Sequence, residues 1–242
     1  MHKSQLATFL ISALTVAILH PLPSAAADND GFTALFNGKD LTGWDGNPDF
    51  WSVSDGILVG QTTPEKPSKG NTFLIWTGTE YKDFELHASC KLEGGNSGIQ
   101  YRSKNLGNWV MAGYQCDIRT PVFDPKDPKN CLGKIYSEKE GRGQMALGGE
   151  KAVYEKDGQK NVVGKVNDLE KVTKAIEQGE WKDVVIIAKG NHILQKINGE
   201  IVCELTDEDE NKRALSGQLG LQIHGGQPMK ISFKNIQIKE LK

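Results

Sequence analysis

The sequence lacks an excess of charge of either sign. Its 29 Lys and Arg residues nearly balance 31 Asp and Glu residues, which gives a formal net charge of −2 at pH 7. Domains that bind nucleic acid usually carry a basic patch or stripe. The balance therefore offers no electrostatic footprint for a nucleic-acid partner.

Long apolar runs are also missing, with one exception at the N-terminus. Lys3 precedes an apolar run from Leu6 to Leu19, and the small residues Ser24 to Ala27 follow. A basic start, an apolar stretch and an A-x-A site are typical of a secretory signal, and the run is shorter than the roughly 18 to 20 residues of a spanning helix. We therefore predict that residues 1–27 are a signal peptide and that the mature chain, from Asp28, is exported to the periplasm or medium without a membrane anchor.

Cysteine is scarce and has no metal-site spacing. Neither a CxxC pair nor a His-x-x-x-His pair is present, so no structural zinc site is indicated. Cys90 and Cys203 continue apolar strand faces and are predicted to be small core residues. Because an exported location permits disulfides, Cys116 and Cys131 remain a possible bridge.

Helical periodicity is rare outside one segment, Asp168 to Gln178, which has an apolar stripe and is followed by Gly179. Elsewhere about twelve or more short alternating segments are joined by turn signals such as Asp55-Gly56 and Asn198-Gly199. We predict an all-β fold, a two-sheet antiparallel sandwich of jelly-roll type with one short helix. Residues 28–242 fit a single domain of this class.

A polar strand face distinguishes the stretch from Gly94 to Thr120. Successive strand side chains alternate between faces, so the pattern places Gln100 with Arg102, and Gln115 with Asp117, opposite the apolar side. Tyr114 belongs to the apolar side. Amide, carboxylate and guanidinium groups on one face are typical of a site for a polar ligand.

Two later segments carry similar polar groups. Tyr136 and Glu138 share one side of an extended segment, with Arg142 shortly after. In the alternation from Gly220 to Gly225, Gln222 and His224 point away from the apolar side. We therefore expect these residues to join the polar strand face in one cleft.

A series of motifs resembles the bacterial 3-keto-disaccharide hydrolase family, also described as a 3-keto-glucoside 1,2-lyase and 3-keto-2-hydroxyglucal hydratase domain. The motifs occur in the family's order over nearly all of the mature chain: LFNGKDLTGW, Trp51 with DGIL, YKDFEL, GGNSGIQYRS, AGYQCDI, GEWKD, KINGEIV, and GLQIHGG followed by ISFKNIQIKEL. The resemblance implies a concanavalin A-like jelly roll, the fold of legume lectins and laminarinase-type glucanases. Many relatives read Gly-Tyr-Glu-x-Gln where this chain has Gln115 and Asp117, so the carboxylate here stands two residues later on the same face.

The resemblance also implies a reaction. A ketone at C3 of a glucoside or disaccharide acidifies the C2 proton, a base removes it, the C1 substituent leaves by elimination, and water adds to the enol. Such a path needs a base, an oxyanion stabiliser and a proton donor. It implies a small-molecule sugar substrate and a functional link to a sugar 3-dehydrogenase that makes the ketone.

We assign roles to the polar residues on this basis. Asp117 or His224 is the base, Arg102 holds the enolate oxygen, and Glu138 or His224 returns a proton. The groups expected to orient substrate hydroxyls are Gln100, Tyr114, Gln115, Tyr136, Arg142 and Gln222. A mutual ion pair between Arg102 and Asp117 explains those two residues equally well, and His224 could instead be a hydrogen-bonded structural residue.

Alternatives remain open at this point. No cofactor is certain, but Asp117, Glu138 and His224 could ligate a divalent cation that polarises the ketone. The same fold serves lectins, so a carbohydrate-binding module without catalysis is a second interpretation. A laminarinase-type retaining glycosidase is less favoured, because no strand carries the alternating carboxylates that it needs.

Overall fold

The computed structural model describes residues 30–122 and 124–242. The predicted signal peptide and its cleavage point lie outside these residues. Within the described part of the chain, no helix is both long enough and apolar enough to cross a membrane.

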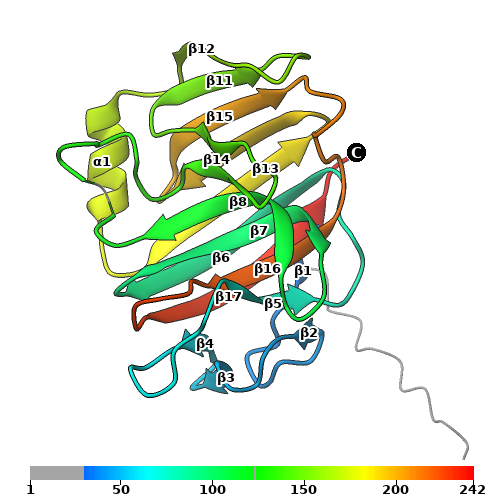
Figure 1. Ribbon diagram of the computed structural model, residues 1–242, viewed down its shortest axis with the longest axis vertical. Coiled ribbons are helices and arrows are strands. Elements are labelled where there is room, and N and C mark those ends of the chain that lie inside the picture. The colour runs from blue at the N-terminus through cyan, green and yellow to red at the C-terminus, as the bar shows by residue number, and fades with distance from the viewer. Residues whose placement is uncertain (1–29, 123) are drawn as a thin grey trace, which may run out of the picture.

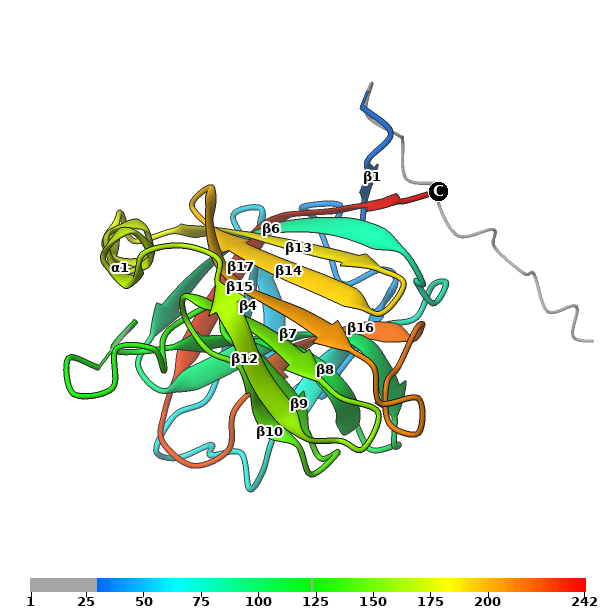
Figure 2. The ribbon, with the colours of Figure 1, turned by 90° about the horizontal axis from the view of Figure 1, so that it is seen from above.

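Two sheets form a sandwich, as predicted, and Figure 2 shows them as separate layers. The ten-stranded sheet contains, in spatial order, β12 (Lys160–Lys165), β11 (Glu150–Tyr154), β15 (Glu200–Asp207), β14 (His192–Ile197), β13 (Lys182–Lys189), β6 (Phe84–Glu93), β17 (Lys230–Glu240), β4 (Ile57–Gln61) and β3 (Trp51–Ser54), with β1 (Thr33–Ala34) paired to β17. The seven-stranded sheet contains β10 (Gly143–Ala146), β9 (Ile135–Glu138), β8 (Met111–Arg119), β7 (Asn96–Asn105), β16 (Gln218–Ile223), β5 (Thr72–Trp76) and β2 (Trp44–Asp45). The pairs are antiparallel except β11 with β15, which run parallel.

The core lies between the two layers. In β13 every second side chain is buried, among them Val184, Ile186 and Ala188, and the others are more exposed. Such alternation is typical of a strand that covers a core on one face and meets solvent on the other. The ten-stranded sheet therefore turns its outer face largely to water.

The central strands of the seven-stranded sheet behave differently. Consecutive residues are buried from Ser97 to Ser103 in β7, from Met111 to Ile118 in β8, and from Leu219 to Ile223 in β16. These strands lie side by side in Figure 1. Because their outward residues include amides and a carboxylate, this sheet carries packed polar groups on its outer face.

Local signals explain several connections. Asn198 and Gly199, with φ of 49° and 85°, form the turn between β14 and β15, as a turn that needs two positive φ angles requires. The predicted helix is confirmed as α1 (Leu169–Glu177), which buries Val172 and Ile176. It lies beside β14 and β15 at one side of the sandwich (Figure 1).

All four cysteines are buried and none is bonded to another. The core placement of Cys90 and Cys203 is confirmed, whereas the possible bridge between Cys116 and Cys131 is absent. Burial raises the pKa of the Cys90 thiol to about 12 and that of Cys131 to about 11. The thiolate, which is the reactive form, is therefore disfavoured.

We predict that a thiol reagent at pH 8 labels no cysteine of the folded protein within minutes. Without reductant, the same reagent in concentrated guanidinium chloride should label all four cysteines per chain. Mass spectrometry of the intact protein counts the labels. Only two labels after unfolding would show a disulfide and contradict the structure.

Candidate functional site

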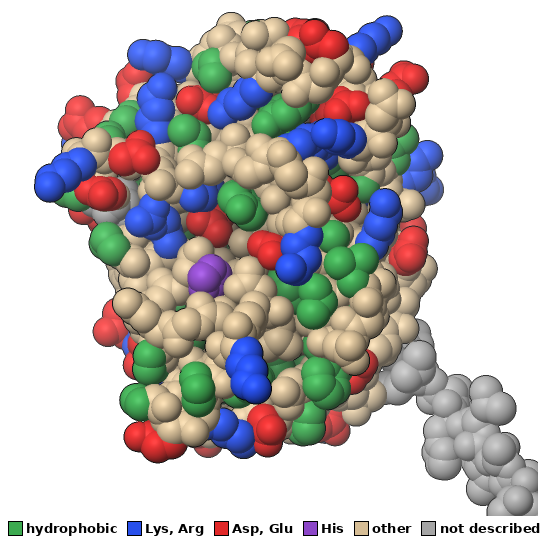
Figure 3. Space-filling model, viewed as in Figure 1, with side chains coloured by type: hydrophobic (Ala, Val, Ile, Leu, Met, Phe, Trp, Pro, Cys, Tyr) green, Lys and Arg blue, Asp and Glu red, His purple; other side chains and the backbone are tan. Residues whose placement is uncertain are grey.

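A polar cleft of about 260 Å³ opens on the outer face of the seven-stranded sheet. Figure 3 shows this face, where basic, acidic and histidine side chains gather around a hollow near the centre. Nine residues line the cleft: Asn71, Asn96, Gln115, Asp117, Lys134, Tyr136, Glu138, Gln222 and His224. Apart from the His224 imidazole, Tyr136 is the single aromatic side chain among them, so the lining suits a hydroxyl-rich ligand better than an apolar one.

Strand alternation and register bring the groups of β8 and β9 together. Gln115 lies opposite Tyr136, and Gly113 lies opposite Glu138. Side chains that alternate along β8 point Gln115 and Asp117 to the same outer face. The two strands therefore place two carboxylates and an amide within one cleft.

A chain of hydrogen-bonded side chains, here called the amide relay, runs from Ser103 through Gln100 and Gln115 to Asp117. The hydroxyl of Ser103 donates to Oε1 of Gln100, and Nε2 of Gln100 donates to Oε1 of Gln115 at 3.1 Å. Nε2 of Gln222 donates to the same Gln115 oxygen at 2.9 Å. Nε2 of Gln115 then donates to Oδ1 of Asp117 at 3.2 Å. An atom that receives two amide N–H groups must be the carbonyl oxygen, so the orientation of the Gln115 amide is fixed.

Lys134 supplies the cation of the cleft. Its Nζ lies 3.3 Å from Oδ2 of Asp117, and the Lys134 and Asp117 side chains are only 8% and 6% exposed. The ammonium also donates to Oδ1 of Asn130 at 2.5 Å. A lysine ammonium has three N–H groups, so one N–H remains for a ligand.

His224 follows β16 with a defined tautomer. Its Nδ1 lies 2.7 Å from the carbonyl oxygen of Gly225. A carbonyl only accepts, so Nδ1 carries the proton and Nε2 of the neutral ring keeps its lone pair. Asn71 connects this segment to β9, because its Nδ2 donates to Oε1 of Glu138 at 3.2 Å and its Oδ1 accepts from the backbone of Gly225 at 3.1 Å.

The structure brings six of the predicted site residues into this cleft: Gln115, Asp117, Tyr136, Glu138, Gln222 and His224. Gln100 is fully buried and contributes through the amide relay, not through direct access to the cleft. Arg102, Tyr114 and Arg142 lie elsewhere.

The predicted position of Arg102 is wrong because a β-bulge interrupts the alternation. The register of β7 against β8 shifts between Tyr101 and Lys104, and Arg102 has a φ of 45°. Its guanidinium donates to the backbone oxygens of Lys82 and Gly190 at 2.8 and 2.6 Å, and to the carboxylate of Asp83 at 3.1 Å. Arg102 therefore joins the two sheets, and the partner of Asp117 is Lys134.

Tyr114 and Arg142 do not orient a ligand in the cleft. The Tyr114 hydroxyl donates to Oδ2 of Asp207, and Nη1 of Arg142 donates to the same oxygen at 2.6 Å. Asp207 is fully buried, although an acidic string such as residues 207–210 is typical of an exposed loop. Burial raises the pKa of the Tyr114 phenol.

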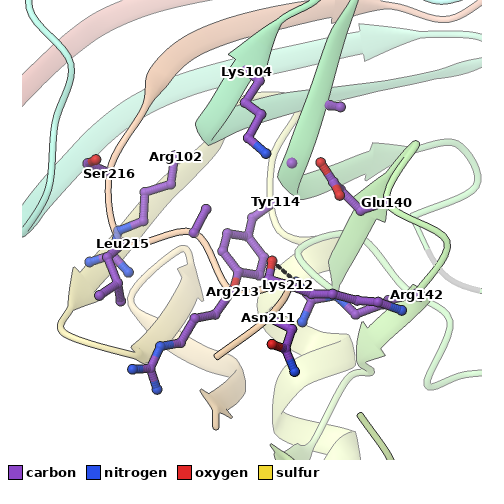
Figure 4. Close-up of a pocket in the computed structure, with 13 residues that line it drawn as sticks. Arg102, Lys104, Tyr114, Glu140, Arg142, Asn211, Lys212, Arg213, Leu215 and Ser216 are labelled. Carbon is purple, nitrogen blue, oxygen red and sulfur yellow. Dashed lines mark hydrogen bonds between the residues drawn. The ribbon is translucent and has the colours of Figure 1, made fainter. Parts of the chain in front are cut away.

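Tyr114 and Arg142 border a second cavity of about 230 Å³ at the end of the sandwich. Figure 4 shows basic side chains around Tyr114, namely Arg102, Lys104, Arg142, Lys212 and Arg213. Three of these cations have carboxylate partners in Asp83, Asp207 and Glu210. The cavity is therefore much less basic than its lining suggests.

Sequence reasoning missed Lys134, Asn71 and Asn96. A signal for Lys134 existed, because Lys134, Tyr136 and Glu138 are spaced two residues apart and alternate to one face. Asn71 and Asn96 stand beside turns rich in glycine, where no periodicity indicates the direction of a side chain.

Asp117, Glu138 and His224 are the residues that the sequence offers as ligands for a divalent cation. Across residues 30–122 and 124–242, no group of three or more His, Cys, Asp or Glu side chains is arranged to hold a metal ion. The charged partner that the described residues give to Asp117 is the ammonium of Lys134.

Comparison with known proteins gives one matching family and a set of structural relatives. A model of the 3-keto-alpha-glucoside-1,2-lyase-like domain matches residues 31–239. A 3-keto-disaccharide hydrolase of Bacteroides thetaiotaomicron is 31% identical over 104 residues, which cover 40% of this chain but only 35% of that relative.

Solved structures agree on the fold. A candidate glycosyl hydrolase from Parabacteroides distasonis is 25% identical with a TM-score of 0.53, over 87% of this chain and 99% of that chain. A Bacillus subtilis protein with a galectin-like fold has the same TM-score at 10% identity, over 81% and 88% of the two chains. These likenesses confirm the jelly-roll sandwich.

Gly98 tests the packing of the amide relay. A Cβ at this position would overlap with Cδ of Gln115, so Gly98→Ala must displace that amide. We expect a loss of about 1–3 kcal/mol in the free energy of unfolding, as overpacking usually causes, measured by denaturant titration. Gly164→Ala is the matched control, because its nearest new contact is 3.9 Å away; equal stability of the two variants would contradict the packing described.

Proposed function

Because the chain belongs to the family of 3-keto-alpha-glucoside-1,2-lyase-like domains, we propose that it cleaves the glycosidic bond of 3-keto-glucosides and 3-keto-disaccharides. The proposed path is abstraction of the C2 proton, elimination at C1 and hydration of the enol. The observation that supports it is one cleft containing an oriented ammonium, an imidazole with an accessible lone pair and a carboxyl group, from Lys134, His224 and Glu138.

The base of this path is His224. Nε2 of its neutral ring holds a lone pair, and imidazole is the side chain whose ordinary pKa best suits proton transfer near neutrality. Asp117 is less suited, because its two oxygens already face Gln115 and Lys134. Its role is to hold the ammonium in place.

Lys134 takes the role that the sequence assigned to Arg102. Removal of the C2 proton places negative charge on the C3 oxygen, and a preorganised N–H donor stabilises it in a largely buried site. Glu138 acts as a carboxylic acid that gives its proton to the departing C1 oxygen and then takes one from the water that adds at C1, while the protonated His224 returns a proton to C2. The contact with Asn71 holds Glu138 in position.

Two polar atoms of the cleft suit substrate hydroxyls. Oε1 of Gln222 and Oδ1 of Asn96 are buried and make no hydrogen bond to any described protein group. A buried acceptor without a donor is costly, and sugar hydroxyls would satisfy both. Tyr136 offers a further hydroxyl contact in the same cleft.

The cellular setting follows from the predicted signal peptide. We propose that the protein acts in the periplasm or medium, where a sugar 3-dehydrogenase would supply the ketone. Fractionation of the native host, with an antibody against the protein, tests the location. Recovery of the protein in the cytoplasm alone would contradict it.

The substrate class is tested by incubating the protein with a 3-keto-glucoside and, separately, with its unoxidised parent. We expect free 3-keto-glucose from the ketone and no release from the parent. Release from the parent would indicate a glycosidase, and binding without release would indicate a carbohydrate-binding module. Turnover should persist after dialysis against EDTA, since the charge is stabilised by Lys134; its loss and return with a divalent cation would favour a metal.

The same assay, applied to the variant His224→Gln, tests the role of His224 as the base. General bases contribute about 10²- to 10⁴-fold to rate, so kcat should fall within that range while Tm stays near that of the unchanged protein. His192→Gln is the control, since His192 is 40% exposed, pairs with Glu204 and lies outside the cleft. Undiminished kcat in His224→Gln would remove His224 from the base role.

A further inference from the structure

Each hydrogen bond along the amide relay is donated in the same direction, toward Asp117. Ser103 donates to Gln100, Gln100 donates to Gln115, and Gln115 donates to Asp117. Gln222 donates to Gln115 from the neighbouring part of the sheet. Because Gln115 Oε1 is occupied by two N–H groups, the amide can present only its Nε2–H to Asp117.

This direction determines how the carboxyl group of Asp117 is oriented. Oδ1 must accept from Gln115, and Oδ2 faces the ammonium of Lys134 at 3.3 Å. Both oxygens of Asp117 therefore face a donor, one on each side of the carboxyl group. The two contacts set the plane in which this group meets Lys134.

We propose that Gln115 is a positioning residue, which directs the remaining N–H of Lys134 into the cleft by orienting Asp117. The role rests on the proposed function, in which that N–H holds the enolate oxygen. Gln115 is only 2% exposed, its Oε1 is occupied by Gln100 and Gln222, and one of its N–H groups is directed to Asp117. It therefore acts through Asp117 and not by touching the reacting atoms.

Gln115→Glu tests the relay with almost no change in shape. One oxygen of the introduced carboxylate would still accept from Gln100 and Gln222, but the other would face Asp117 across the 3.2 Å that separates the present amide nitrogen from Oδ1. Two carboxylates so close share a proton and titrate as a pair. The other charged or titratable groups that face this pair across the cleft are Lys134, Tyr136, Glu138 and His224, and Lys134 already lies on the far oxygen of Asp117.

The expected result of Gln115→Glu is a pH-dependent defect. The shared proton raises one carboxyl pKa in the folded state, so the Tm deficit relative to the unchanged protein should grow as pH rises from 5 to 8. Over the same range kcat should fall at least tenfold relative to the unchanged protein, with KM altered much less. Gln61→Glu, at an exposed position of β4, is the charge-matched control and should show neither effect.

The exchange variant Gln115→Glu/Asp117→Asn provides rescue. The introduced asparagine can donate its Nδ2–H to the introduced glutamate and accept from Lys134 through its Oδ1, which restores each hydrogen bond with one carboxylate. We expect Tm to lose its added pH dependence and kcat to return to within about tenfold of the unchanged protein. An exchange variant that folds but stays as slow as Gln115→Glu would overturn the positioning role.

The Tm profile against pH is measured without substrate, so it separates the positioning role of Gln115 from the proposed function. If the unchanged protein turns over no 3-keto-glucoside, the proposed function fails, and with it the positioning role. If turnover occurs but Gln115→Glu shows the same Tm and kcat profiles against pH as Gln61→Glu, the relay is wrong and the function stands.

Discussion

The hydrogen bonds that meet at Oε1 of Gln115 are the constraint on which the cleft depends. Two amide donors, from Gln100 and Gln222, fix one end of this side chain, and the other end can then only donate to Asp117. Both polar atoms of the Gln115 amide have partners, and hydrogen bonds in a buried site of this kind are stronger than in water. Asp117, held in this arrangement, lies 3.3 Å from the ammonium of Lys134, whose other partner is Asn130.

The network lies on the central strands of the seven-stranded sheet, which are buried on both faces. A strand that covers a core on one side usually exposes its other side, but β7, β8 and β16 are buried on both. Packing amides against each other on the outer face is possible because Gln100, Gln115 and Gln222 are hydrogen-bonded to one another across strands. Gly98 adds the space that the Gln115 side chain occupies, so small and polar residues together form the buried floor of the cleft.

Most of what the sequence predicted correctly came from the alternation of side chains between the two faces of a strand. It indicated the all-β fold and the outward direction of Gln115, Asp117, Gln222 and His224. It failed at Arg102, because one extra residue at a β-bulge reverses every direction after it and no residue type marked that bulge. The burial of Asp207 is equally invisible to it, because that burial depends on partners from a different sheet. Long-range pairings of this kind leave no local pattern.

Removal of the C2 proton is the chemistry that the cleft is proposed to perform, and deuterium at C2 tests it most directly. In D₂O, elimination and hydration should give 3-keto-glucose carrying one solvent deuterium at C2, detected by mass spectrometry and NMR at early times. A reaction without protein, containing the same product, corrects for spontaneous exchange. Product with hydrogen retained at C2, together with equal rates for substrates carrying hydrogen and deuterium at C2, would contradict this chemistry, because neither solvent exchange nor breaking of the C2–H bond would then accompany cleavage at C1.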